Sequence, residues 1–226
     1  MKAELHFSTP IYSSFDDRFV KSLNKISDGL ILKSKKENIK ALKDREKDID
    51  KKIGDHGFSY QSDSLIYNKN FDDFKNYIGE LSVAVLDSQG YNLKEHVLFF
   101  KELWVQQFAE KGGGHHNTHV HFNSHLSGFY FLKASDKTPF PIFHDPRVGK
   151  DMIQLPRKNI NALDISNDMV NFKVKPGSLI IFPSYLPHEF DIDHGVDTFR
   201  FIHFNMQAIS KEVLWVNISL KKMVFK

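Results

Sequence analysis

The chain has 226 residues, of which 41% are hydrophobic, and its 21 Phe residues can fill one large core. Its 31 Lys and Arg residues nearly balance 28 Asp and Glu residues, so the net charge of +3 does not indicate a nucleic-acid-binding surface. Cysteine is absent, which excludes disulfides, iron–sulfur clusters, thiolate zinc sites and a cysteine nucleophile. Any bound metal must therefore be held by nitrogen and oxygen ligands.

The first residues contain Glu4 and lack the apolar stretch of a signal peptide. No uninterrupted apolar run reaches the roughly 18 residues that a membrane-spanning helix needs. We therefore expect a cytoplasmic protein of one domain that does not enter a membrane.

The pattern of residues 1–94 predicts a mostly helical N-terminal part that packs on the barrel formed by the following residues. Apolar residues recur three and four apart over 15–32, which predicts an amphipathic helix. Residues 33–55 are rich in Lys, Asp and Glu and predict an exposed helix or a connector. Asn70 is a plausible N-cap for a second helix, whose buried stripe runs from Phe71 to Leu81.

Residues 95–210 predict a mainly β structure, and 211–226 a C-terminal extension. Short apolar segments separated by Pro and Gly are typical of an antiparallel jelly roll or barrel. The expected strands cover 96–108, 118–123, 127–133, 140–144, 170–175, 178–183 and 198–206. The fold class is therefore α+β with a dominant jelly roll braced by N-terminal helices.

Five histidines between His115 and His125, together with His188 after an apolar strand, indicate a metal site. Alternate side chains of a strand share one face, so we expect His119, His121 and Asn123 to point the same way. His188 follows a Pro-rich corner from which a partner strand can close the same site. A surface accident stays open as an alternative for these histidines, and is favoured for His115, His116 and His125.

Arg200 lies among large apolar residues in the last strand. A buried guanidinium needs an anionic partner, because burying it unpaired costs several kcal/mol. A ligand carboxylate and a structural Asp or Glu are the two alternatives. His144, His194 and His203 are interpreted as ordinary polar or core positions.

These motifs, in this order, resemble the iron(II)/2-oxoglutarate-dependent oxygenase family found in marine bacteria and cyanophages. The resemblance is carried by His119-x-His121-x-Asn123-Ser124-x-x-Ser127-Gly128-x-Tyr130, Phe143-His144-Asp145-Pro146-Arg147, Pro176-Gly177, Phe182-Pro183-Ser184-x-Leu186-x-His188 and Arg200-x-x-x-Phe204-Asn205. Residues 57–62 and Trp104 also fit, so the resemblance covers most of the chain beyond about residue 55. It implies a cupin-like double-stranded β-helix with iron at its open end.

The resemblance implies that His119 and His188 are metal ligands and that Arg200 holds the distal carboxylate of 2-oxoglutarate. Tyr130 is then a second donor to the co-substrate. Such enzymes usually hold iron by two His and one carboxylate, yet His121 stands where the carboxylate is expected. Either His121 is the third ligand, or Asn123, Asp145 or water fills the place.

The implied reaction consumes 2-oxoglutarate and molecular oxygen, releases succinate and hydroxylates a C–H bond of a prime substrate. A protein side chain, a small metabolite and a nucleobase all stay open as that substrate, as does a homodimer. Gly113 lies five residues before His119, as in a cupin motif, so a cupin-type enzyme without 2-oxoglutarate is one alternative. A non-catalytic binding module stabilised by metal is another.

Overall fold

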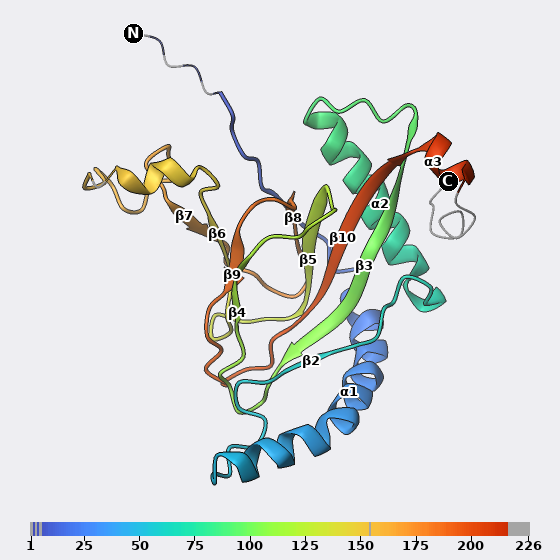
Figure 1. The fold of residues 1–226 in the computed structure, drawn as a ribbon, viewed down its shortest axis with the longest axis vertical. Helices are drawn as coiled ribbons and strands as arrows, with labels where there is room; N and C mark the ends of the chain where they lie inside the picture. Colours follow the sequence, from blue (N-terminus) through green and yellow to red (C-terminus); the bar gives the residue numbers. More distant parts are fainter. Residues whose placement is uncertain (1, 3, 5, 154, 217–226) are drawn as a thin grey trace.

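The computed structural model describes residues 2, 4, 6–153 and 155–216 and consists of two antiparallel β-sheets with helices on one side (Figure 1). The six strands of the larger sheet lie in the order β1 (Tyr12–Phe15), β8 (Ser178–Pro183), β5 (Leu126–Lys133), β10 (Arg200–Ser210), β3 (His96–Phe108) and β2 (Ser59–Gln61). The smaller sheet contains β4 (His116–His119), β9 (His188–Phe190), β6 (Pro141–His144) and β7 (Met169–Asn171). The two sheets form the predicted jelly roll, so the expected fold class is confirmed.

The helices lie on the outer face of the larger sheet (Figure 1). Helix α1 (Val20–Asp48) and helix α2 (Asp72–Ser88), which follows the 3-10 turn η1 (Lys69–Phe71), supply most of this layer. A second 3-10 turn, η2 (Val148–Met152), lies between β6 and β7, and a short helix α3 (Lys211–Val216) follows β10. Helix α1 includes most of the charged segment that the sequence left as a helix or a connector.

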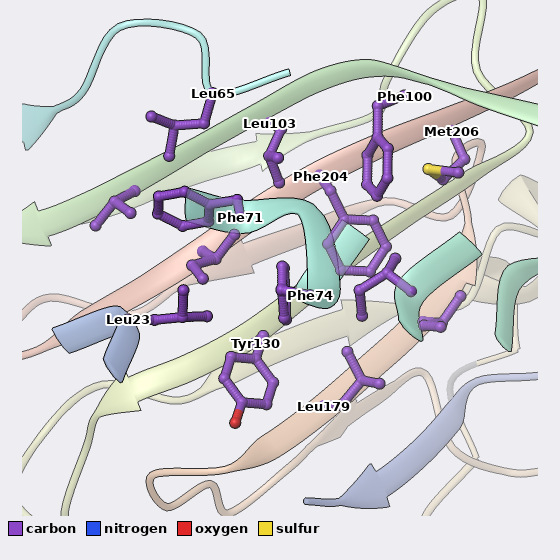
Figure 2. Close-up of a cluster of buried hydrophobic side chains, with 14 of the residues drawn as sticks. Leu23, Leu65, Phe71, Phe74, Phe100, Leu103, Tyr130, Leu179, Phe204 and Met206 are labelled. Atoms are coloured by element: carbon purple, nitrogen blue, oxygen red, sulfur yellow. The ribbon is translucent and has the colours of Figure 1, made fainter. Parts of the chain in front are cut away.

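One hydrophobic core fills the space between the helices and the larger sheet. Figure 2 shows Leu23 of α1 and Phe74 of α2 facing Leu103 of β3 and Phe204 of β10. These side chains are at most 2% exposed, and burying such a side chain contributes about 1.5–3 kcal/mol. The helices therefore hold the back of the sheet rigid.

A second core, rich in Phe, fills the space between the two sheets. Its buried members are Phe108, Phe129, Phe131, Phe143, Ile180, Phe182, Leu186, Phe190, Phe199 and Phe201. Along β10 the sides alternate: Phe201 belongs to this inner core, whereas Ile202 and Phe204 face the helices. The inner face of β10 therefore carries residues 201, 203 and 205 toward the smaller sheet.

The strands differ from the sequence prediction mainly at their ends. The segment 178–183 is found as predicted, but β4 ends at His119 where a strand was expected to continue to 123. β1, β2 and β9 were not predicted as strands; they have only four, three and three residues. The N-terminal 94 residues are thus mostly helical but also contribute both edge strands of the larger sheet.

Within the described residues, no helix is both long enough and apolar enough to cross a membrane.

Candidate metal centre

Three histidines meet where β4 and β9 pair. His119 is the last residue of β4, and its Cα partner in the ladder is His188, the first residue of β9. His121 lies in the turn after β4, where its backbone N–H donates to the Ser184 carbonyl at 2.9 Å. Pairing and this anchored turn bring together the three residues that the sequence predicted as ligands.

The three imidazoles converge on one point. One ligand nitrogen of each lies within 4.8 Å of the others, and the Nε2 atoms of His121 and His188 are 3.2 Å apart. Two nitrogens bound at right angles to one metal at about 2.1 Å lie about 3.0 Å apart. The spacing of His121 and His188 therefore fits two neighbouring positions on one ion.

Backbone carbonyls orient two of the rings. The Nδ1 atom of His119 lies 2.7 Å from the Asn117 carbonyl, and that of His188 lies 2.9 Å from the Leu186 carbonyl. Each Nδ1–H donates to its carbonyl, which leaves Nε2 with its lone pair free for a metal. This support is the usual one for metal-binding histidines.

Burial keeps the rings of His121 and His188 uncharged. Burial lowers the pKa of His188 to about 3, and burial and the neighbouring His119 lower the pKa of His121 to about 4. Neutral imidazole is the form that binds a metal, so protons do not compete for these nitrogens near neutral pH. His188 is 1% exposed, whereas His119 and His121 are half-buried, so the group has one open side.

The donor set fits iron. Imidazole nitrogen binds Fe(II), Zn(II), Ni(II) and Cu(II), and in the described part of the chain this group offers three protein donors and no fourth. Three donors leave coordination positions for small molecules, as in catalytic sites, while structural sites are closed by four.

A second group of donors shares His121. Glu102 of β3, His121 and His203 of β10 place one ligand atom each within 4.8 Å of one another. The rings of His121 and His203 have centroids 4.7 Å apart, and burial lowers the pKa of His203 well below its ordinary value. The sequence prediction missed Glu102 and took His203 as an ordinary core position.

Alternation along the strands could have found both residues. Glu102, Trp104 and Gln106 occupy every second position of β3, and Phe201, His203 and Asn205 do so in β10. Polar residues at such positions of two apolar central strands predict a polar lining of the barrel interior.

Arg200 lies apart from the histidines. Its guanidinium donates to Asp28 Oδ1 of α1 at 2.7 Å and to Gln107 Oε1 at 2.7 and 2.9 Å, with longer contacts to Asn24. Alternation along β10 puts the Arg200 side chain on the helix-covered side, together with Ile202 and Phe204. The Asp28 carboxylate is thus an anionic partner for Arg200, as in the second of the two alternatives that the sequence left open.

Three other predicted site residues also lie outside the histidine group. Tyr130 is buried in the outer core, where its hydroxyl donates to the Asp16 carbonyl at 2.7 Å. Asn123 is exposed in the turn after His121 with a φ of 53°, so it does not share a strand face with the histidines. Asp145 pairs with Arg147 at 2.6 Å and Lys150 at 3.2 Å, and the Arg147 hydrogen bond holds the pKa of Asp145 well below its usual range.

Among the other histidines, His116 differs from its predicted surface role. It packs between Phe108 and Phe190 of the inner core, and its Nε2 lies 2.6 Å from Gln106 Nε2. Burial lowers its pKa to about 4. His115 and His125 are exposed, as the sequence predicted.

A large cavity lies beside this group rather than within it. It has a volume of about 620 Å³ and is lined by parts of residues 6–11, 143–147 and 163–173 together with Leu186. Phe143 and Leu186 line the cavity and also contact His188. The cavity and the metal centre therefore share a wall.

Comparison with known proteins agrees with this geometry. Residues 102–205 match the model of a family described as "Putative 2OG-Fe(II) oxygenase". This match spans β3 to β10 and includes all three converging histidines. No curated protein matches the chain.

Three solved structures are similar in fold. AviO1 from Streptomyces viridochromogenes Tue57 has a TM-score of 0.54 and 12% identity over 88% of this chain and 90% of its own. The prolyl-4-hydroxylase of Pseudomonas putida has a TM-score of 0.50 and 8% identity over 88% and 94%. A prolyl hydroxylase of Trichoplax adhaerens, solved with a hypoxia inducible factor peptide, has a TM-score of 0.50 and 9% identity over 86% and 82%.

At these identities the structural likeness establishes the fold alone, here the double-stranded β-helix. The family match indicates the chemistry, and the three convergent imidazoles are candidate ligands for its metal. Residues 102–205 of this chain thus match a 2OG-Fe(II) oxygenase family, a description that implies Fe(II) as the metal and 2-oxoglutarate as the co-substrate.

Proposed function

We propose that the chain is a hydroxylase that holds Fe(II) by His119, His121 and His188 and couples the oxidation of 2-oxoglutarate to hydroxylation of a C–H bond. The observation that carries the proposal is the half-exposed group of three imidazoles, with no fourth protein donor among the described residues. Molecular oxygen is the oxidant for both half-reactions, and bound iron would activate it.

The residues around the metal centre orient the ligand histidines and exclude water from one side. His188 and the Phe rings of the inner core exclude water from one side, because His188 packs against Phe129 and Phe182 at 5.7 and 4.6 Å between centroids. The Asn117 and Leu186 carbonyls hold the rings of His119 and His188 with Nε2 turned toward the metal. The open side next to His119 and His121 is left for the co-substrate and the prime substrate.

Succinate formation tests this proposal. Aerobic Fe(II)-loaded protein with 2-oxoglutarate and ascorbate should form succinate slowly even without a prime substrate, and faster with the correct one. His188→Ala, which removes a ligand, should reduce succinate to background. Succinate at background in the wild type, with iron bound and every substrate fraction tried, overturns the hydroxylase.

One observation favours a second candidate, a cupin-type enzyme that uses the metal without 2-oxoglutarate. Arg200, expected to hold the distal carboxylate, is engaged by Asp28 and Gln107. The candidates separate by calorimetry with 2-oxoglutarate and Mn(II)-loaded protein. Binding supports the hydroxylase, and an absence of binding supports the cupin-type enzyme.

A further inference from the structure

A polar row crosses the interior of the larger sheet beside the histidines. Ser127 of β5, Asn205 of β10 and Glu102 of β3 are partners in the strand registers. Ser127 Oγ donates to Asn205 Oδ1 at 2.5 Å and contacts Ser184 Oγ at 2.8 Å, while Asn205 Nδ2 donates to Glu102 Oε2. Hydrogen bonds thus link a carboxylate at one end to a serine pair at the other.

This row touches the metal centre at His121. Asn205 Nδ2 lies 3.1 Å from His121 Nδ1 as well as bonding Glu102. Asn205 is completely buried, so its partners fix its side chain. Glu102 is half-buried, and its carboxylate oxygen lies within 4.8 Å of a ring nitrogen of His121.

His121 needs such a partner when it binds a metal. His119 and His188 each give their Nδ1–H to a carbonyl, but the neighbour of His121 Nδ1 is an amide nitrogen, which is a donor. When Nε2 of His121 is a ligand, Nδ1 carries the proton and requires an acceptor. A Glu102 carboxylate oxygen lies within 4.8 Å of a ring nitrogen of His121, so the carboxylate moves closer to accept this proton.

Charge points to the same residue. Three neutral imidazoles leave the full double charge of Fe(II) uncompensated, whereas the usual set of two His and one carboxylate removes one unit. A carboxylate that accepts a proton from a ligand histidine partly restores this charge and makes the imidazole more basic. The neighbouring His203 is 3% exposed, and its Nε2 has no hydrogen-bond partner among the described residues, but as a neutral imidazole it supplies no negative charge.

We propose that Glu102 is the positioning carboxylate of the metal centre: held by Asn205, it accepts the Nδ1 proton of metal-bound His121 in place of the carboxylate that the ligand set lacks. The proposal rests on the proposed function only in taking His121 as a metal ligand. It makes Glu102 a neighbour of a ligand and not a ligand.

The test measures metal affinity of the full chain with Co(II), without any turnover. Glu102→Gln keeps the shape and removes the charge, and it should weaken Co(II) binding by about 10- to 100-fold, the usual effect of losing a partner of a ligand. Glu189→Gln is the matched control. Glu189 follows His188 directly but contacts Thr118 and lies 3.4 Å from His144, so its loss should change the affinity less than about threefold if the route through His121 matters.

A second variant and a spectroscopic measurement guard against misfolding. Asn205→Ala should weaken binding as Glu102→Gln does, and the double variant should be no worse than the weaker single one, because both act through one contact. In the Zn(II) form, ¹⁵N spectra of labelled histidines should place a proton on Nδ1 of His121 and show it displaced in Glu102→Gln, with the His119 signal unchanged.

The outcomes separate the inference from the function. A wild type that binds one Co(II) while Glu102→Gln binds it equally well overturns this inference and leaves the proposed function standing. Two Co(II) ions per wild-type chain and one in Glu102→Gln overturn it in favour of a second metal position at Glu102, His121 and His203. A wild type that binds no Co(II) overturns both.

Discussion

Single residues decide what the metal centre can hold. His119 and His188 are paired across two strands and each is oriented by a carbonyl, so neither ring needs to rearrange when a metal arrives. Tight metal binding therefore needs all of these preoriented rings together, because two imidazoles alone bind a metal weakly.

Removing either paired ligand should therefore abolish tight binding. In His119→Ala and His188→Ala we expect Mn(II) affinity to fall by more than the ~10- to 100-fold that loss of an outer partner costs. His115→Ala, which removes an exposed histidine of the same segment, should bind as the wild type. Calorimetric titration of the three variants measures this, and equal affinity in all of them would contradict the assignment.

Arg200 provides a second prediction at this scale. Because its guanidinium joins β10 to Asp28 of α1, Arg200→Ala should lower the free energy of unfolding by about 1–3 kcal/mol, the cost of buried groups left without a partner. The hydrogen bond from Arg200 lowers the pKa of Asp28, yet Asp28 is largely exposed, so Asp28→Asn should cost under about 1 kcal/mol. Urea unfolding measures both. Unchanged stability in Arg200→Ala with 2-oxoglutarate binding lost would show that this side chain turns into the barrel.

At the scale of elements, close packing of the strands limits the size of the side chain at some positions. A Cβ at Gly128 of β5 would lie 2.7 Å from the Ile180 carbonyl oxygen of β8 and would also strike the Phe204 ring of β10. Gly29 of α1 is exposed and has no atom within 4 Å of such a Cβ.

The two glycines should consequently respond in opposite directions to alanine. Gly128→Ala should destabilise by about 1–3 kcal/mol, since overpacking forces strands apart. Gly29→Ala should stabilise by about 0.5–1 kcal/mol, because alanine is the better helix former. Thermal unfolding of both variants measures the difference, and destabilisation by Gly29→Ala would mean that α1 is not a regular helix at this point.

Elements with strong local signals were predictable from the sequence. Strand β8 and most of β5 are apolar runs bounded by turn residues, and the His119-x-His121 pair with His188 marked the centre. Alternation along β10 puts Arg200 on the helix-covered side, but its partner Asp28 was not predictable, because Asp28 lies 172 residues away in the sequence. The three-residue strand β9 is likewise fixed by pairing and not by its own composition.

At the scale of the whole molecule, the buried histidines make stability depend on pH. Burial holds the pKa of His188 at about 3 and those of His116 and His121 at about 4, below the ordinary value of 6.5. The unfolded chain therefore takes up protons first as the pH falls. The stabilisation is complete above pH 6.5 and is lost progressively as the pH falls from 6.5 toward 4.

Metal-free protein should thus lose stability steeply in mild acid. Each histidine contributes up to about 1.4 kcal/mol per pH unit, so three contribute about 4 kcal/mol per unit at the steepest point. This is a large share of the 5–15 kcal/mol that typical domains possess. Urea unfolding at pH 7, 6 and 5 with a chelator measures how the free energy of unfolding changes with pH. His116→Gln should lower the number of protons taken up on unfolding by one. Saturating metal should add stability at pH 7. A slope below one proton between pH 6.5 and 5 would mean that the folded protein protonates these rings and that water reaches the centre.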